Sequence, residues 1–169
     1  MLKYSFTTGF LLLICVAAFS QDAYESWNKR YTETSITDML LFERAYADSV
    51  DRGLIEGKYY TRLGLYQVEA EYLGRKRAIA DSTVTSIRNV NKLFGEKDFS
   101  PVISRLENEY LFRVDSVDHW FAMQDVLEDP FKKEVSVHDT VLLYCMFFNE
   151  HHENGALYNT FLISEFRKE

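Results

Sequence analysis

The sequence predicts an all-α protein, an antiparallel up-down-up-down four-helix bundle with a kinked first helix. Three observations lead to this prediction. The 169 residues include seven Gly and two Pro, which are few for the many turns of a β-sandwich or barrel. One long stretch carries apolar residues at alternating intervals of three and four, as heptad-like helices do. Finally, four helical segments of similar length are joined by mostly short connections, which favours antiparallel neighbours.

The first helix is expected over residues 23–52, where apolar and aromatic residues recur at helical spacing. Its middle is rich in β-branched and hydroxyl residues. Ser35, followed three positions later by Asp38, resembles a capping box. We therefore expect a kink or a restart of the helix at this point, and a turn around Gly53 and Gly57 after it.

The second helix is expected over residues 58–94 and carries the heptad-like seam. The seam consists of Tyr59, Leu63, Tyr66, Ala70, Leu73, Ala80, Val84, Ile87 and Phe94. Residues 82–87 also have β propensity. Val84 and Ile87 would fall on opposite faces of a strand but on one face of a helix, so the helix assignment is kept.

Clear start signals precede the third and fourth helices. Ser100 is a good N-cap, Pro101 suits the first helical position, and the third helix should end at Asp129–Pro130. The fourth helix should open at Ser136. Residues 141–148 are apolar on all sides, so this helix is expected to be the most enclosed.

Residues 1–20 have the layout of a secretory signal peptide. Lys3 precedes an apolar run over residues 9–18, and Ala18 and Ser20 supply the small residues before a cleavage site at Gln21. The alternatives are an uncleaved anchor or a buried helix, but the run is shorter than the ~20 residues that span a bilayer. The sequence thus predicts export to the periplasm or outside the cell, and a single domain over residues 21–169.

The exported chain would keep one cysteine, Cys145, so it could form no internal disulfide. The sequence also contains no Asn-x-Ser/Thr sequon. Both features fit a bacterial periplasm. No later segment is long and apolar enough to cross a membrane, so no membrane span is expected after signal removal.

Composition and motifs exclude several classes of function. The net charge of −7 argues against nucleic-acid binding, which needs a basic face. The chain has no Gly-rich phosphate loop, nucleophile elbow, paired-histidine zinc motif, C-x-x-C or EF-hand loop. It also lacks the Glu-x-x-His pairs of di-iron bundles. We therefore expect no cofactor and no metal.

The best candidates for a ligand pocket are tyrosines of the second segment. Tyr59, Tyr66 and Tyr72 could form a wall of the pocket, because tyrosine combines an apolar ring with a polar end. At helical spacing, aromatic residues more often belong to an ordinary core. His152 falls on the apolar stripe of the last segment, where it is either a hydrogen-bonded core histidine or part of a catalytic or metal site.

One ion pair is predicted inside the bundle. Arg77 interrupts the seam of the second helix, and a buried charge is costly unless it is paired. Counting back from the turn places Asp118 at the same height on the third helix, and Glu33 on the first helix as a second acceptor. The alternative is that Arg77 keeps its guanidinium in water.

These observations favour an exported, non-enzymatic bundle that binds another protein. The identity of that protein does not follow from the sequence, but an acidic surface suits a basic partner. One alternative is a small-molecule binder with the tyrosine-rich pocket in its core. A second alternative is an enzyme or a metal protein that uses His152.

Overall fold

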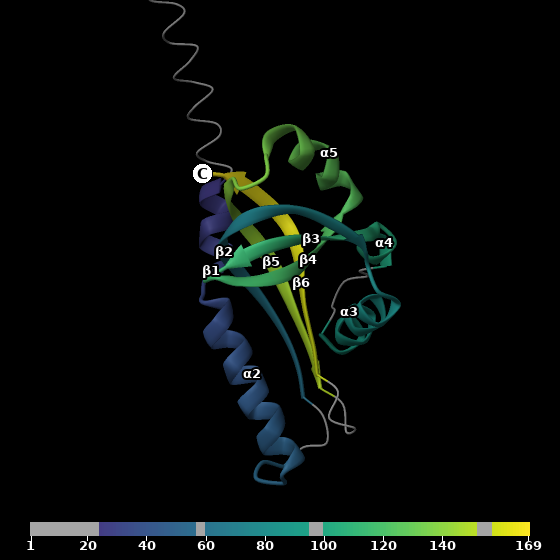
Figure 1. The fold of residues 1–169 in the computed structure, drawn as a ribbon. Coiled ribbons are helices and arrows are strands. Elements are labelled where there is room, and N and C mark those ends of the chain that lie inside the picture. The colour runs from purple at the N-terminus through teal and green to yellow at the C-terminus, as the bar shows by residue number, and fades with distance from the viewer. Residues whose placement is uncertain (1–23, 57–59, 95–99, 152–156) are drawn as a thin grey trace, which may run out of the picture.

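The computed structural model describes residues 24–56, 60–94, 100–151 and 157–169. Its centre is a β-barrel rather than a helical bundle (Figure 1). The predicted signal peptide, Tyr59 and His152 lie outside the described residues. In chain order, the elements are the helical residues 24–30, β1 (Thr32–Glu33), α2 (Ile36–Asp51), β2 (Tyr60–Ala78), α3 (Asp81–Phe94), α4 (Ser100–Ile103), β3 (Leu106–Val114), β4 (Val117–Gln124), α5 (Asp125–Glu134), β5 (Thr140–His151) and β6 (Leu157–Lys168).

Five strands close the barrel in the order β2-β3-β4-β6-β5, and β5 pairs back to β2. Closure depends on the 19-residue strand β2, whose first part pairs with β5 and whose last part pairs with β3. β4 and β6 run parallel, whereas the other pairs within the barrel are antiparallel. β1 adds a short parallel strand to β2, outside the barrel.

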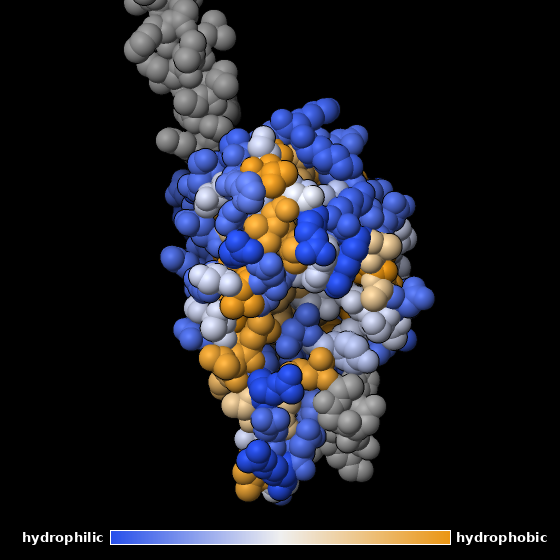
Figure 2. Space-filling model, viewed as in Figure 1, coloured by the Kyte–Doolittle hydropathy of each residue, from blue (hydrophilic) through white to orange (hydrophobic). Residues whose placement is uncertain are grey.

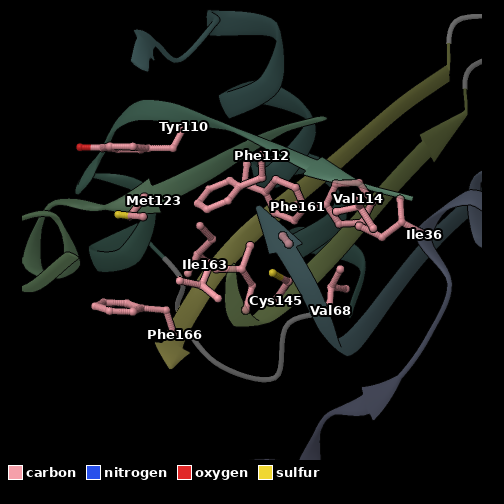
Figure 3. Packing of buried hydrophobic residues seen from close by; sticks show 14 of the residues in the cluster. Ile36, Val68, Tyr110, Phe112, Val114, Met123, Cys145, Phe161, Ile163 and Phe166 are labelled. Atoms are coloured by element: carbon pink, nitrogen blue, oxygen red, sulfur yellow. The ribbon is translucent and has the colours of Figure 1, made fainter. Parts of the chain in front are cut away.

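The inside of the barrel holds the main core. Alternate residues of each strand point inward, and a barrel of so few strands is narrow enough for side chains to fill. Figure 3 shows Phe112, Phe161 and Cys145 among the side chains that meet there. The barrel strands contribute Val68, Ala70, Tyr110, Phe112, Val114, Phe121, Met123, Val141, Leu143, Cys145, Phe147, Phe161, Ile163 and Phe166 to this core, and Ile36, Met39, Phe131 and Val135 join them from outside the strands.

A second core lies on the outer face of the barrel, under α3 and α4. It consists of Ile87, Val90, Ile103, Leu106, Ala122, Phe148 and Leu162. The helical residues 24–30 cover another part of the outer face, where Trp27 packs against Tyr144 of β5 with 5.6 Å between ring centroids. β5 is therefore buried on both faces.

α2 lies on the opposite side of the long strands from α3 and α4 (Figure 1). Its buried residues are Ile36, Met39, Glu43, Ala47 and Val50. Among the described residues, no helix has the length and apolar character needed to cross a membrane.

The predicted four-helix bundle is wrong, and the double burial of β5 explains one error. A strand that is covered on both faces has a continuous apolar sequence. The run at residues 141–148, which predicts the most enclosed helix, belongs to such a strand. The seam of residues 58–94 is divided between β2 and α3. The helix assigned to residues 82–87 is confirmed, because α3 spans them.

The local start signals had mixed outcomes, and the predicted helix start at Ser136 is wrong because β5 follows it. Ser35 caps α2, and its side chain accepts a hydrogen bond from the amide of Asp38 at 3.2 Å, so the predicted restart is confirmed. A helix does begin at Ser100, but α4 has four residues before the chain enters β3. Pro130 lies inside α5 instead of ending a helix.

Candidate functional site: an acidic cleft beside β1

An open cleft of about 930 Å³ lies where β1, the middle of β2, the turn between β3 and β4, and the C-terminal residues meet. Four of its lining residues are acidic, namely Glu33, Glu69, Asp115 and Glu169. The other polar residues of the lining are Asn28, Thr34, Ser35, Gln67 and Arg167. The cleft therefore gathers four acidic side chains around one hollow.

The strand register brings these four acids together from distant parts of the chain. Glu33 of β1 lies opposite Gln67 of β2, so it is close to Glu69 two positions further along. Asp115 occupies the tight turn after β3, where its φ is 49°. Glu169 is held beside the start of β5, because its amide donates to the carbonyl of Thr140 at 3.2 Å.

One cation lies in the cleft and is already engaged. The guanidinium of Arg167 donates to Glu169 Oε1 from Nε at 3.0 Å and from Nη2 at 2.7 Å. This pair offsets one of the four acids. Glu33, Glu69 and Asp115 therefore give the cleft an excess of negative charge, which attracts cations and repels phosphates.

Three apolar residues also line the cleft. Val68, Val114 and Leu142 come from three strands of the barrel, and the first two are buried in the main core. On the rim, Asn28 Oδ1 accepts a hydrogen bond from the hydroxyl of Tyr144 at 2.7 Å.

The tyrosines predicted as a ligand wall pack against the core instead of lining this cleft, as far as the described residues show. Tyr66 packs on Phe147 with 6.2 Å between ring centroids. Tyr72 meets the ring of Phe131 edge-on at 5.0 Å. Their use as a ligand wall remains a prediction, and so does any role for His152.

The predicted ion pair between Arg77 and Asp118 does not form, because the strand register gives each residue another partner. Arg77 lies opposite Glu109 in the β2–β3 pair and donates to its Oε2 at 2.6 Å. Asp118 lies opposite Arg113 in the β3–β4 pair and accepts from its Nε at 2.8 Å. Both Arg77 and Asp118 are exposed rather than part of the core, and Glu33 lines the cleft.

A second polar feature lies near the end of β5. The His151 ring is buried, and its Nε2 is 3.2 Å from Oδ1 of Asp51 at the end of α2. On the other face of the strand, Glu150 accepts a hydrogen bond from Asn89 of α3 at 2.9 Å. Among the described residues, no group of three His, Cys, Asp or Glu side chains is arranged to hold a metal ion.

Comparison of the chain with models of known families, with curated proteins and with solved structures finds no match. The assignment of a site therefore depends on geometry. Sequence reasoning missed Glu69, Asp115 and Glu169 as a group, because they are far apart in the chain and share no motif. Glu33 was singled out only as an acceptor for Arg77.

Proposed function

We propose that this protein is an exported binding protein whose acidic cleft takes up a cationic segment of a partner protein. The observation that carries the proposal is the excess of acidic side chains around the open cleft. Lysine and arginine side chains fit such a lining, because their stems pack on apolar atoms while their charged ends bind carboxylates. Export is supported by the signal-peptide layout of residues 1–20.

The charge distribution favours a protein partner over a nucleic acid. The net charge of the whole chain is −7, and three acids of the cleft are not offset by Arg167. Such a field steers a basic surface toward the cleft and repels a phosphate backbone. No catalytic step is part of this proposal.

A direct binding experiment tests the cleft. The probe is a fluorescein-labelled oligolysine peptide, and its anisotropy is followed as the protein is added. We expect saturable binding that weakens as salt is raised, because exposed charges are screened. The triple variant Glu33→Gln/Glu69→Gln/Asp115→Asn should bind about tenfold or more weakly, a loss of about 1.4 kcal/mol or more.

The matched control, Glu107→Gln/Asp129→Asn/Glu134→Gln, removes three exposed carboxylates from β3 and α5 outside the cleft. It should leave the affinity unchanged. Equal binding by the triple variant and the wild type would contradict the proposal. So would equal losses in the triple variant and the control, since the effect would then follow net charge rather than the cleft.

The natural partner can be sought with the same pair of proteins. The wild-type protein and the triple variant are used as bait in parallel affinity captures from the native envelope fraction. A partner that uses the cleft should carry a basic segment and be lost with the triple variant. The mass of the protein recovered from that fraction also tests export, because cleavage before Gln21 removes residues 1–20.

A further inference from the structure

The outer face of α2 carries apolar side chains that the barrel leaves exposed. Leu41 is 63% exposed and Phe42 is 54% exposed. At about 100° per residue, Leu41 points away from the buried face of the helix, which carries Met39 and Ala47. Phe42 lies on the flank of the helix, where its ring packs against Tyr46 with 6.3 Å between ring centroids. Figure 2 shows hydrophobic surface over α2 and at its lower end, bordered by hydrophilic residues.

The charged residues on this face alternate in sign. Read from the other end of the helix, the same positions carry the opposite charges. Asp38, Arg44, Asp48 and Arg52 are all exposed, and their signs alternate along the chain. Asp38 and Arg52 lie equally far from Ala45 on its two sides, and they carry opposite charges. Arg44 and Asp48 are centred on Tyr46, one position further along. A copy of the helix that runs in the opposite direction, with the two-fold axis at Ala45, would therefore set Asp38 opposite Arg52 and would bring Arg44 within two residues, about 3 Å along the axis, of Asp48.

We propose that the outer face of α2 is the interface of a two-fold symmetric dimer, in which α2 of a second copy packs antiparallel against it. Asp38 then lies opposite the partner's Arg52, and Arg44 lies beside the partner's Asp48. A two-fold axis repeats each pair, because such an interface uses the same surface of both subunits. This self-complementarity selects a second copy over an unrelated partner.

The apolar residues complete the contact between the two helices. Ala45 and Ser49 lie on the same face as Leu41 and Phe42, and their small side chains allow the helix axes to approach closely. Leu41 and Phe42 of each copy can pack over these small residues of the other copy. Leu54, which follows the helix and is 73% exposed, adds apolar surface at both ends of the interface.

The size of the contact sets the expected strength of the dimer. α2 has 16 residues, so it is about 24 Å long. Two such helices bury less than the roughly 1,600 Å² of a standard interface. The dimer should therefore be weak and should dissociate on dilution.

Sedimentation-velocity ultracentrifugation of the purified protein over a dilution series tests this arrangement. We expect a concentration-dependent monomer–dimer equilibrium in the wild type. Leu41→Asp should give a monomer at every concentration. Asp38→Arg and Arg52→Asp should each weaken the dimer about tenfold or more, because like charges then oppose each other twice.

The decisive variant combines the two charge reversals. Asp38→Arg/Arg52→Asp remakes both pairs with the signs exchanged, so it should restore the wild-type dimer. Val126→Asp is the matched control, since Val126 is 51% exposed on α5, away from α2. A wild type that stays monomeric at its highest soluble concentration would overturn the proposal. So would a dimer that survives Leu41→Asp, or a double variant that is no stronger than the single ones.

Discussion

The ring of Tyr66 lies over Gly64, two residues earlier on the same face of β2. A Cβ atom on Gly64 would come within 2.7 Å of both Cζ and the hydroxyl oxygen of that ring. The ring also packs on Phe147, which lies directly opposite Gly64 in the β2–β5 pair. The absence of a side chain at Gly64 therefore gives Tyr66 its place on the main core.

We expect Gly64→Ala to lower the free energy of unfolding by about 1–2 kcal/mol, because the added methyl group pushes the Tyr66 ring away from Phe147. Urea denaturation measures this loss. In a Tyr66→Ala background the same substitution should be nearly neutral, since the ring is gone. Losses of equal size in both backgrounds would mean that the two residues are not coupled.

The turn between β3 and β4 places two residues in the left-handed region. Asp115 has a φ of 49° and Ser116 a φ of 69°, between Val114 and Val117, which pair across the hairpin. A turn with positive φ at both central residues favours glycine at the second one. We expect Ser116→Gly to raise the free energy of unfolding by up to about 1 kcal/mol, measured in urea.

Ser116→Ala is the control for this turn, because it removes the hydroxyl without relieving the strain at positive φ. It should give no gain in stability. A Ser116→Gly variant less stable than Ser116→Ala would contradict the conformation of the turn.

This turn also shows why the barrel could not be predicted from composition. The low glycine count predicts few turns, yet the β3–β4 hairpin turns through Asp115 and Ser116 without glycine. The helical spacing of apolar residues also led to a wrong prediction, for a related reason. Strands covered on both faces, such as β5, lose the alternation that distinguishes a strand from a helix. The β-branched and aromatic residues of β5 were the remaining strand signal.

Signals within a few residues were informative, whereas long-range ones were not. Ser35 and Asp38 predicted the start of α2, since a cap depends on local backbone geometry. The cleft depends on the parallel pairing of β1 with β2 and on the position of the C-terminus. Glu69 and Glu169 are 100 positions apart, and no local pattern predicts that they line one cleft.

The reactivity of the Cys145 thiol tests whether the interior of the barrel is closed to solvent. Cys145 belongs to the main core, and burial raises the pKa of its thiol. Because the thiolate is the reactive form, we expect iodoacetamide to leave Cys145 unmodified in the native protein and to modify it fully in urea, as measured by peptide mass. Ser104→Cys adds an exposed thiol as a positive control. Equal rates at both positions in the native protein would contradict a buried Cys145.

The carboxylate of Glu128 on α5 accepts hydrogen bonds from three side chains, of which two belong to β2 and β3 and one to α5. Lys132 Nζ and Lys76 Nζ donate to its Oε2 at 2.8 and 2.9 Å, and Asn108 Nδ2 donates to its Oε1 at 2.7 Å. Burial of Glu128 acts to raise its pKa, but the hydrogen bonds outweigh this effect and lower the pKa from 4.5 to about 2. The ionised form therefore stabilises the folded state.

Because the pKa of Glu128 is lowered in the folded state, the stability that its carboxylate contributes decreases as the pH falls. The contribution of Glu128 is fully present above its unfolded-state pKa of 4.5 and is lost as the pH falls toward about 2. We expect Glu128→Gln to lower the free energy of unfolding at neutral pH by about 2 kcal/mol, since the two lysines remain partly solvated. Urea denaturation at a series of pH values should show a smaller acid-induced loss for this variant than for the wild type. Glu134→Gln, at the exposed end of the same helix, should keep the wild-type slope. Parallel curves for Glu128→Gln and the wild type would show that Glu128 is not the carboxyl responsible.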